Sequence, residues 1–312
     1  MVEKRFRIQN LFDALQDIGE AAQSLLQGFG GNTASDQLGL CRNEYAKAVE
    51  DGTPSFAPDD LPEYSGHPFD IVARNVPFFS EGERAVEIGC ERYSELDEVG
   101  RCGAAFALVS KETMSEDGES RRTIKQIIPS GWRDTEYGFI EGKKLYNRCH
   151  LIGYRLTGEH ANERNLITGT RYMNHAMRVF ENMVADHCGQ HGEARVLFRV
   201  TPIYKGSELV ARGIRMEALS ICEDEAPLQF NVYLHNIQPG VRIGYATGDN
   251  CRDDSIQDSM VHDCIVNDAA KTLHRASCPS AQTIKNEKAR KHTGMRQELI
   301  EEGYKPCGRC RP

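Results

Sequence analysis

A histidine, an asparagine and a glutamate in the middle of the chain are the residues whose types and spacing could perform chemistry. His150 lies near the end of a run, Lys144–Tyr154, that predicts a β-strand, and a polar loop follows it. A helical pattern then begins near Arg171. Asn174 and Glu181 are seven residues apart on that helix, about two turns, so both project from one neighbouring face.

These residue types suit the metal-assisted hydrolysis of a phosphodiester. An amide oxygen and a carboxylate are hard ligands for Mg²⁺, which keeps most of its waters and takes few protein groups. A histidine can take a proton from an attacking water, while the metal neutralises charge on the phosphate and on the leaving oxygen. From the spacing alone, the competing interpretation is a structural histidine, hydrogen-bonded beside a strand.

An arginine that stabilises the charged phosphate is also expected chemically. The sequence does not choose between the candidates, which are Arg133, Arg164, Arg171 and Arg178.

The sequence pattern around these residues predicts an α+β domain with a mostly antiparallel sheet, whose helix and strands hold them in place. The helix after Arg171 has an apolar stripe at spacings of four, three and four, which marks its buried face. The stripe consists of Met173, Met177, Phe180 and Val184. Further predicted strands are Ala104–Ser110, Leu197–Tyr204 and Phe230–Ile237, and Ile203–Val210 predicts a hairpin turn.

Four divisions are predicted along the chain. Residues 1–62 form a helix over residues 6–27 and a linker, and residues 63–250 form the main domain. Periodicity is lost from residue 240 onward, which predicts a linker over 251–264, and residues 265–312 form a small separate module.

Composition and charge narrow the class of protein. The 312 residues are 39% hydrophobic and 27% charged, which excludes a wholly disordered chain, and no apolar run approaches the roughly 20 residues of a membrane-spanning helix. The net charge is −8, but residues 265–312 hold ten Lys and Arg against five Asp and Glu. A basic tail on an acidic body suggests an anionic partner for the tail, although a solvated helix face has the same pattern.

The N-terminus and the cysteines bear on the compartment. The chain starts basic without an apolar segment and cleavage site after it, so we expect a cytoplasmic protein at synthesis, with export by a route without a cleaved signal left open. Most of the eleven cysteines are isolated in the sequence, which favours buried thiols over a disulfide framework.

The tail has the spacing of a zinc site. His274 and Cys278 form one pair of soft ligands, and Cys307 and Cys310 form another. Tetrahedral Zn²⁺ takes four such ligands, and a module of about 48 residues has too little core to be stable without a staple. Cys264 is an alternative ligand ranked below His274, and the simplest competing interpretation is two ordinary cysteines near a frayed terminus.

The segment Asn147–His150, followed by Leu151–Tyr154, resembles the Asp-Arg-Gly-His motif of the DNA/RNA non-specific endonucleases. These are ββα-metal enzymes, and the most similar branch holds streptococcal DNA-entry nucleases and secreted DNases. The resemblance covers roughly residues 64–249. Further matching segments are Asn75–Phe79, Gly100–Gly103, Pro129–Trp132 and Phe180–Asp186.

The resemblance implies a role for each residue that matches the family motif. His150 would be the general base, and Asn174 would be the one protein group that contacts Mg²⁺. Glu181 would hold a metal-bound water, and Asn165 would support the site from the loop before the helix. Arg148 would position the site or contact phosphate.

Two positions depart from the motif, whose Asp is Asn147 here and whose Gly is Cys149. Loss of the acid removes a negative charge near His150. As a strand neighbour of His150, Cys149 should point to the opposite side, so we expect a packing thiol rather than a nucleophile.

The tail segment Gly303–Cys310 resembles the close of the zinc-binding domain of the Ada DNA-repair protein. That domain uses four cysteines, one of which accepts a methyl group. His274 stands at the first ligand position here, and imidazole is not an accepting thiolate, so the resemblance implies a structural zinc site. Its basic residues would contact DNA phosphates; they are Lys285, Lys288, Arg290, Lys291 and Arg296.

The sequence therefore predicts a Mg²⁺-dependent endonuclease with a ββα-metal core and a C-terminal structural zinc module. Its expected substrates are DNA and RNA, with 5′-phosphorylated products. One alternative is a catalytically impaired nucleic-acid-binding protein, in which the altered motif marks a retired site. Another is an exported antibacterial nuclease toxin, which would have a neutralising immunity protein as partner.

Overall fold

The computed structural model describes residues 61–115, 123–140, 142–221, 228–258, 261–275, 278–285, 288–295, 299 and 302–308. The helix expected over residues 6–27, and with it residues 1–60, lies outside the described residues, as do Arg296 and Cys310.

A six-stranded sheet, in which every neighbouring pair is antiparallel, forms the base of the main domain. The predicted strands over 104–110, 197–204 and 230–237 are confirmed within a residue or two. In sheet order the strands are β1 (Phe69–Ile71), β8 (Gln229–His235), β7 (Gly213–Ser220), β6 (Arg195–Ile203), β3 (Ala105–Ser110) and β2 (Glu91–Tyr93).

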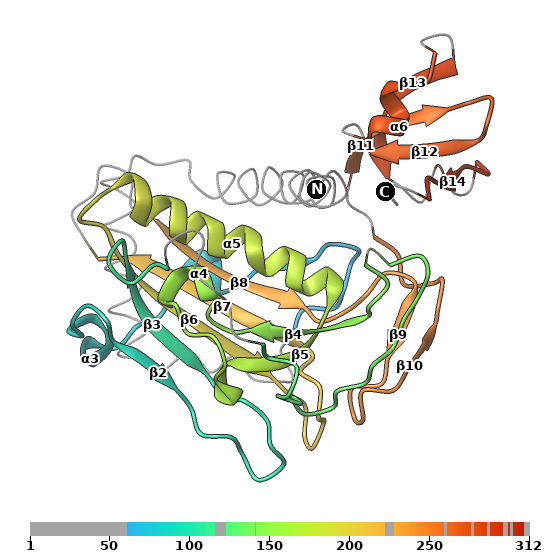
Figure 1. Cartoon of the computed structure of the whole chain (residues 1–312). Helices are drawn as coiled ribbons and strands as arrows, with labels where there is room; N and C mark the ends of the chain where they lie inside the picture. The colour runs from blue at the N-terminus through green and yellow to red at the C-terminus, as the bar shows by residue number, and fades with distance from the viewer. Residues whose placement is uncertain are drawn as a thin grey trace.

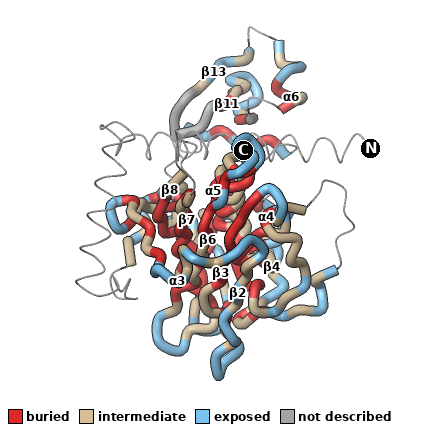
Figure 2. Tube along the Cα trace, turned by 90° about the vertical axis from the view of Figure 1, so that its left-hand side faces the viewer, coloured by how far each residue is buried: buried red, intermediate tan, exposed pale blue. Residues whose placement is uncertain are grey.

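Helix α5 (Arg171–Gln190) runs along one face of this sheet and contacts β3, β6 and β8 (Figure 1). The Thr170 hydroxyl caps its first turn by accepting a hydrogen bond from the Met173 amide at 3.1 Å. The four predicted stripe residues of the helix are buried in the main core. In Figure 2 the buried stretches, in red, gather in α5 and in the strands β6, β7 and β8 of the sheet.

Two further strands lead directly into α5. β4 (Tyr146–His150) pairs antiparallel with β5 (Leu166–Thr170), and Arg171 begins the helix immediately afterwards. Between the two strands lie the short helix α4 (Tyr154–Thr157) and the 3-10 turn η2 (Glu163–Asn165). This β4–β5–α5 unit is the strand, strand and helix order that was predicted for the core.

The predicted strand over residues 144–154 is too long. β4 ends at His150, because Leu151 already donates its amide hydrogen bond to the Asn165 carbonyl oxygen rather than to a β5 residue. Gly153 then serves as the N-cap of α4. The turn after His150 brings Gly153 and Tyr154 into the lining of a groove beside β4.

The predicted loss of regular structure from residue 240 onward is also wrong. β9 (Val241–Ile243) and β10 (Asn250–Arg252) form an antiparallel hairpin. Val241 and Ile243 are buried in a second small core with Tyr146, which explains why so short a strand is stable. Strand β11 (Val261–Asn267) likewise begins inside the stretch predicted as a linker. The domain boundaries themselves stay a prediction.

The C-terminal part forms a separate sheet, which lies apart from the main domain in Figure 1. Its strand order is β13 (Ala289–Met295), β11, β12 (Thr272–Arg275) and β14 (Lys305–Pro306), with the short helix α6 (Pro279–Gln282) beside it. Its small core contains Val266, Leu273 and Tyr304.

The remaining short elements of the main domain are the 3-10 turn η1 (Ala73–Asn75) and the helix α3 (Glu81–Arg84). Among the described residues, no helix combines the length and the apolar character needed to cross a bilayer.

Candidate active site

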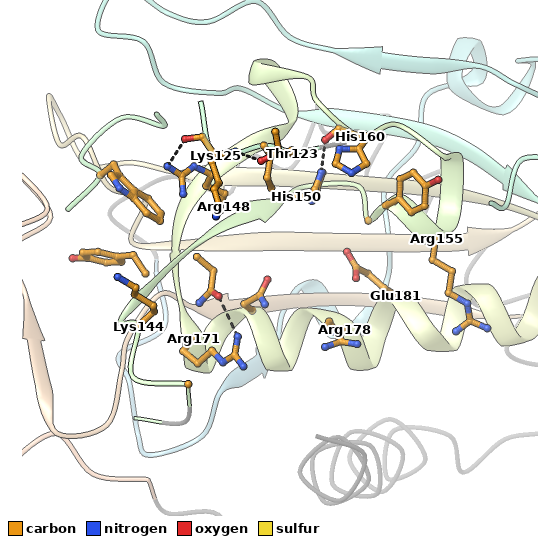
Figure 3. Close-up of a pocket in the computed structure, with 18 of the residues that line it drawn as sticks. Thr123, Lys125, Lys144, Arg148, His150, Arg155, His160, Arg171, Arg178 and Glu181 are labelled. Atoms are coloured by element: carbon orange, nitrogen blue, oxygen red, sulfur yellow. Dashed lines mark hydrogen bonds between the residues drawn. The ribbon is translucent and has the colours of Figure 1, made fainter. Parts of the chain in front are cut away.

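A groove of about 1160 Å³ lies between β4, residues 123–134 and one face of α5. His150 lines it from the strand and Glu181 from the helix, as Figure 3 shows. Asn174 also lines it from the helix. In all, six basic side chains and two carboxylates line it. The basic ones are Lys125, Lys144, Arg148, Arg155, Arg171 and Arg178, and the carboxylates belong to Asp134 and Glu181. This excess of positive charge suits an anionic ligand.

The imidazole of His150 is fixed by a backbone carbonyl. Its Nε2 lies 2.8 Å from the carbonyl oxygen of His160, as Figure 3 shows. A carbonyl oxygen only accepts, so Nε2 carries the hydrogen and Nδ1 is the basic nitrogen of the neutral ring. His150 therefore has the tautomer and the fixed orientation that a general base requires.

Asn165 holds the chain immediately after His150 and does not line the groove. Its side chain is fully buried and makes two hydrogen bonds to the backbone of Ile152. The Ile152 amide donates to Oδ1 at 2.8 Å, and Nδ2 donates to the Ile152 carbonyl oxygen at 3.0 Å. The predicted site residue Asn165 thus acts on the backbone behind the base.

Glu181 is held against the turn that follows β4. The amide of Gly153 donates a hydrogen bond to its carboxylate, and a Cβ at residue 153 would lie 2.7 Å from Oε1. Only glycine lets the carboxylate approach the backbone this closely. Burial raises the pKa of the Glu181 carboxyl to about 7, although the nearby Arg178 and the Gly153 hydrogen bond act to lower it. A bound cation would favour the charged form of this carboxyl.

Arg148 is engaged with the wall of the groove. Its guanidinium carbon lies 4.1 Å from the centre of the Trp132 ring, and Nη2 donates to the Lys125 carbonyl oxygen at 2.9 Å. Nε donates to the Ile127 carbonyl oxygen. Of the two roles expected for Arg148, these contacts favour positioning, because they tie β4 to residues 125–132.

The structure separates the four candidate arginines. Arg171 and Arg178 line the groove from α5. Arg133 pairs with Asp249 at 3.0 Å and Arg164 with Glu95 at 2.6 Å, and neither arginine lines the groove.

The two departures from the motif have different environments. Cys149 is fully buried, and burial raises the pKa of its thiol well above the usual range. Its sulfur lies 2.4 Å from where a Cβ of Gly169 would be, so the strand partner has no side chain where the thiol packs. The prediction of a packing thiol is confirmed. Asn147 instead lines the groove, and its Oδ1 accepts a hydrogen bond from Arg171 Nη1 at 3.2 Å.

Several groove residues were not predicted from the sequence. His160 and Tyr154 lie edge to face, with ring centres 5.4 Å apart, and both line the groove with Lys125 and Arg155. The carbonyl oxygen of His160 is the group that orients His150, and no side-chain pattern encodes a backbone contact. Tyr154 and Arg155 begin a helix after Gly153. The sequence would have indicated this helix if the predicted strand had ended at His150.

Three of the four tail residues expected to bind zinc converge, and the fourth, Cys310, lies outside the described residues. The ligand atoms of His274, Cys278 and Cys307 lie within 4.8 Å of one another, and all three residues are buried. His274 Nδ1 is buried and has no hydrogen-bond partner among the described residues, while Nε2 lies 3.1 Å from the Thr272 hydroxyl. Burial lowers the pKa of His274, which favours the neutral imidazole that a metal needs. One imidazole and two thiols fit three of four zinc positions.

Cys264 belongs to a different cluster. It packs with Leu273 and Tyr304 in the small core of the sheet, whereas Cys278 and Cys307 pack together near α6. The geometry therefore favours His274 over Cys264 as the ligand.

Comparison with known proteins points to nucleases. Residues 83–221, which include His150, Asn174 and Glu181, match the family model of the DNA/RNA non-specific endonucleases. A protein of Streptococcus dysgalactiae subsp. equisimilis named Deoxyribonuclease is 25% identical over 206 residues, 53% of this chain and 62% of that protein. The chain thus spans about 62% of the length of this curated relative. Both matches support an endonuclease.

One solved nuclease structure shares this fold, and a second is similar over part of the chain. NucA from Streptococcus agalactiae with a bound magnesium ion has a TM-score of 0.52 and 22% identity, over 67% of this chain and 97% of that one. The Sda1 nuclease with a bound zinc ion has a TM-score of 0.46 and 26% identity, over 54% and 83% of the respective chains.

The raised pKa of Glu181 predicts a pH-dependent stability in magnesium-free buffer. The folded state favours the protonated form of this carboxyl. Its contribution to the free energy of unfolding is therefore fully present below about pH 4.5 and is lost as the pH rises through about 7. Relative to Glu181→Gln, the wild type should therefore lose about 2–3 kcal/mol of unfolding free energy across this range. Urea denaturation at pH 4.5, 6 and 8 measures the difference.

The control for this experiment is Glu98→Gln, which changes an exposed carboxyl and should follow the wild type at every pH. A constant difference between wild type and Glu181→Gln at all three pH values would contradict the environment described for Glu181.

Proposed function

We propose that this protein is a metal-dependent endonuclease that hydrolyses phosphodiester bonds of DNA. The premise is that its active site lies within residues 83–221, which match the DNA/RNA non-specific endonucleases. The observation that supports this most is the groove itself, in which the oriented His150 shares one basic cavity with Asn174 and Glu181. RNA is a second proposed substrate, because the matched family acts on both nucleic acids.

In the proposed reaction His150 is the general base. Its Nδ1 takes the proton of a water as the water oxygen bonds to phosphorus, and the bond from phosphorus to the 3′ oxygen breaks. The 3′ oxygen leaves with the bonding electron pair and takes a proton from solvent water, which gives a 3′ hydroxyl. One product then carries a 5′-phosphate, as expected from the resemblance. The hydrogen bond from Nε2 to the His160 carbonyl oxygen keeps the ring oriented and stabilises the imidazolium that forms.

Mg²⁺ is the proposed cation, since the groove offers an amide and a carboxylate oxygen on one helix face. Asn174 would contact it, and Glu181 would hold one of its waters. When bound, such a cation neutralises charge on the phosphate and the leaving oxygen. The NucA structure with magnesium, which has this fold, is consistent with the choice. Arg178, beside Glu181, is proposed to contact the charged phosphate.

We also propose that the C-terminal module is a structural zinc site that helps to hold nucleic acid. Its ligands would be His274, Cys278 and Cys307, with Cys310 as the fourth. Lys285, Lys288 and Lys291 are exposed and suited to phosphate contacts, whereas Arg290 is already bonded to Asp268.

The nuclease proposal predicts Mg²⁺-dependent cleavage that two substitutions remove. With plasmid DNA as substrate, His150→Ala should lower the rate about 10²–10⁴-fold, as expected for loss of a general base. Asn174→Ala should abolish the response to Mg²⁺, because the proposed protein ligand is gone. Gel assays in Mg²⁺ and in EDTA, repeated with RNA, measure both effects.

The matched control is His191→Ala, which changes an exposed histidine outside the groove and should cleave at the wild-type rate. Cleavage that persists in both groove variants would mean that the site is wrong. Salt-sensitive DNA binding by a wild type that never cleaves would support the alternative of a retired enzyme, which the departures at Asn147 and Cys149 favour.

The zinc proposal predicts one equivalent of zinc in the purified protein, measured by elemental mass spectrometry. Cys307→Ser should lose this zinc, because three ligands no longer complete a tetrahedral site. Cys264→Ser should keep it, since Cys264 packs in the other cluster. Stoichiometric zinc in Cys307→Ser, or its loss only in Cys264→Ser, would overturn the ligand assignment.

A further inference from the structure

Two hydrogen-bond donors are buried without an acceptor at one end of the groove. They are Nε of Arg171 and Nδ2 of Asn147, and neither has a partner among the described residues. Both residues line the groove, and they are linked to each other by the hydrogen bond from Arg171 Nη1 to Asn147 Oδ1 at 3.2 Å (Figure 3). A buried donor without an acceptor is costly, so such a pair points to a ligand that accepts.

The charge around the two donors selects an anionic acceptor. Of the two carboxylates that line the groove, Asp134 is paired with Lys144 at 2.6 Å, and Glu181 contacts Gly153. The other charged side chains of the lining are all basic, so an oxygen with negative charge fits better than a neutral one. The backbone amides of Arg171 and Tyr172 are already bonded, to the Leu145 carbonyl oxygen and the Gln238 side chain. The anion would therefore be held by side chains.

We propose that Arg171 and Asn147 form a subsite for a phosphate that is not cleaved, next to the phosphate that is hydrolysed. The inference rests on the proposed nuclease function. Arg171 precedes Asn174 by three residues, about 4.5 Å along the helix, and successive phosphates of one DNA strand advance about 3.4 Å along the axis. A strand lying along α5 with one phosphate near Asn174 thus has the next one near Arg171.

This subsite gives a physical reason for an amide at position 147. A carboxylate has only acceptor oxygens, so it would neutralise Arg171 and repel a phosphate. The Asn147 amide accepts from Arg171 through Oδ1, and its Nδ2 remains a donor that has no acceptor among the described residues. An Asp at this position, as in the motif that the sequence resembles, would accept from Arg171 but would have no donor for an anion.

Salt-dependent DNA binding tests the subsite without cleavage. In a His150→Ala background, affinity for a 20-base-pair duplex is measured by fluorescence anisotropy from 50 to 300 mM NaCl. Removing one phosphate contact should lower the slope of log K against log salt by about 0.9. We expect this change in both Asn147→Asp and Arg171→Ala. Asn147→Asp is close to isosteric, so it keeps the test valid where Arg171→Ala fails to fold.

The matched control is Arg164→Ala, which removes an exposed arginine outside the groove and should leave the slope unchanged. An unchanged slope in Asn147→Asp and Arg171→Ala, with the parent still binding DNA, would overturn the subsite and assign the two donors to bound water. A parent that binds no DNA, together with a wild type that does not cleave, would instead sink the proposed function.

A second measurement separates the subsite from the chemistry. Bis(p-nitrophenyl) phosphate is a diester without a neighbouring phosphate. In the active enzyme, with His150 intact, Asn147→Asp should lower kcat/KM for DNA about tenfold more than it lowers kcat/KM for this small diester. An equal loss on both substrates would mean that Asn147 acts on the reacting phosphate, against the proposal.

Discussion

The buried amide of Asn165 is the interaction on which the geometry of the site depends. Its two hydrogen bonds to Ile152 fix the chain two residues after His150 and end strand β4 at that point. The turn that results carries Gly153 to Glu181 and begins α4. One buried side chain therefore fixes the backbone that follows the base and leads to the Gly153 contact with Glu181. Because Asn165 is fully buried, loss of either hydrogen bond would leave a polar group unpaired.

The rest of the groove surrounds polar groups that are buried without a full set of charged or hydrogen-bonding partners among the described residues. Burial raises the pKa of Glu181, and two donors near the start of α5 have no acceptor among the described residues. A cation at Glu181 and an anion at Arg171 would each relieve one of these costs. A metal-bound nucleic-acid strand supplies both at once, which links the proposed chemistry to the proposed substrate.

Local patterns in the sequence predicted the elements that local interactions determine. The start of α5 and its apolar stripe were readable, as were β3, β6 and β8. Strand β7 was missed because its alternation is hidden by the buried ion pair of Arg215 and Glu217 at 3.0 Å. The β9–β10 hairpin was missed because Val241 packs on residues about a hundred positions earlier in the chain.

The candidate site likewise contains residues that the sequence indicated and residues that it did not. His150, Asn174 and Glu181 were identified from residue type and spacing, whereas Arg148 was identified only through the resemblance. Three of the four zinc candidates meet as expected. The sequence did not choose between four arginines, because the acids that pair with Arg133 and Arg164 lie far away in the chain. The His160 carbonyl oxygen, which orients the base, belongs to no side chain and has no sequence pattern.

The central claim is that a divalent cation binds between His150 and α5. Anomalous diffraction from crystals of the full chain soaked in Mn²⁺ tests it most directly, because the ion is then located rather than inferred. The account predicts a peak within about 2–2.5 Å of the Asn174 side-chain oxygen, with Glu181 one water further away. A groove without a peak under conditions that support cleavage, or a peak bound only by the C-terminal cysteines, would contradict it.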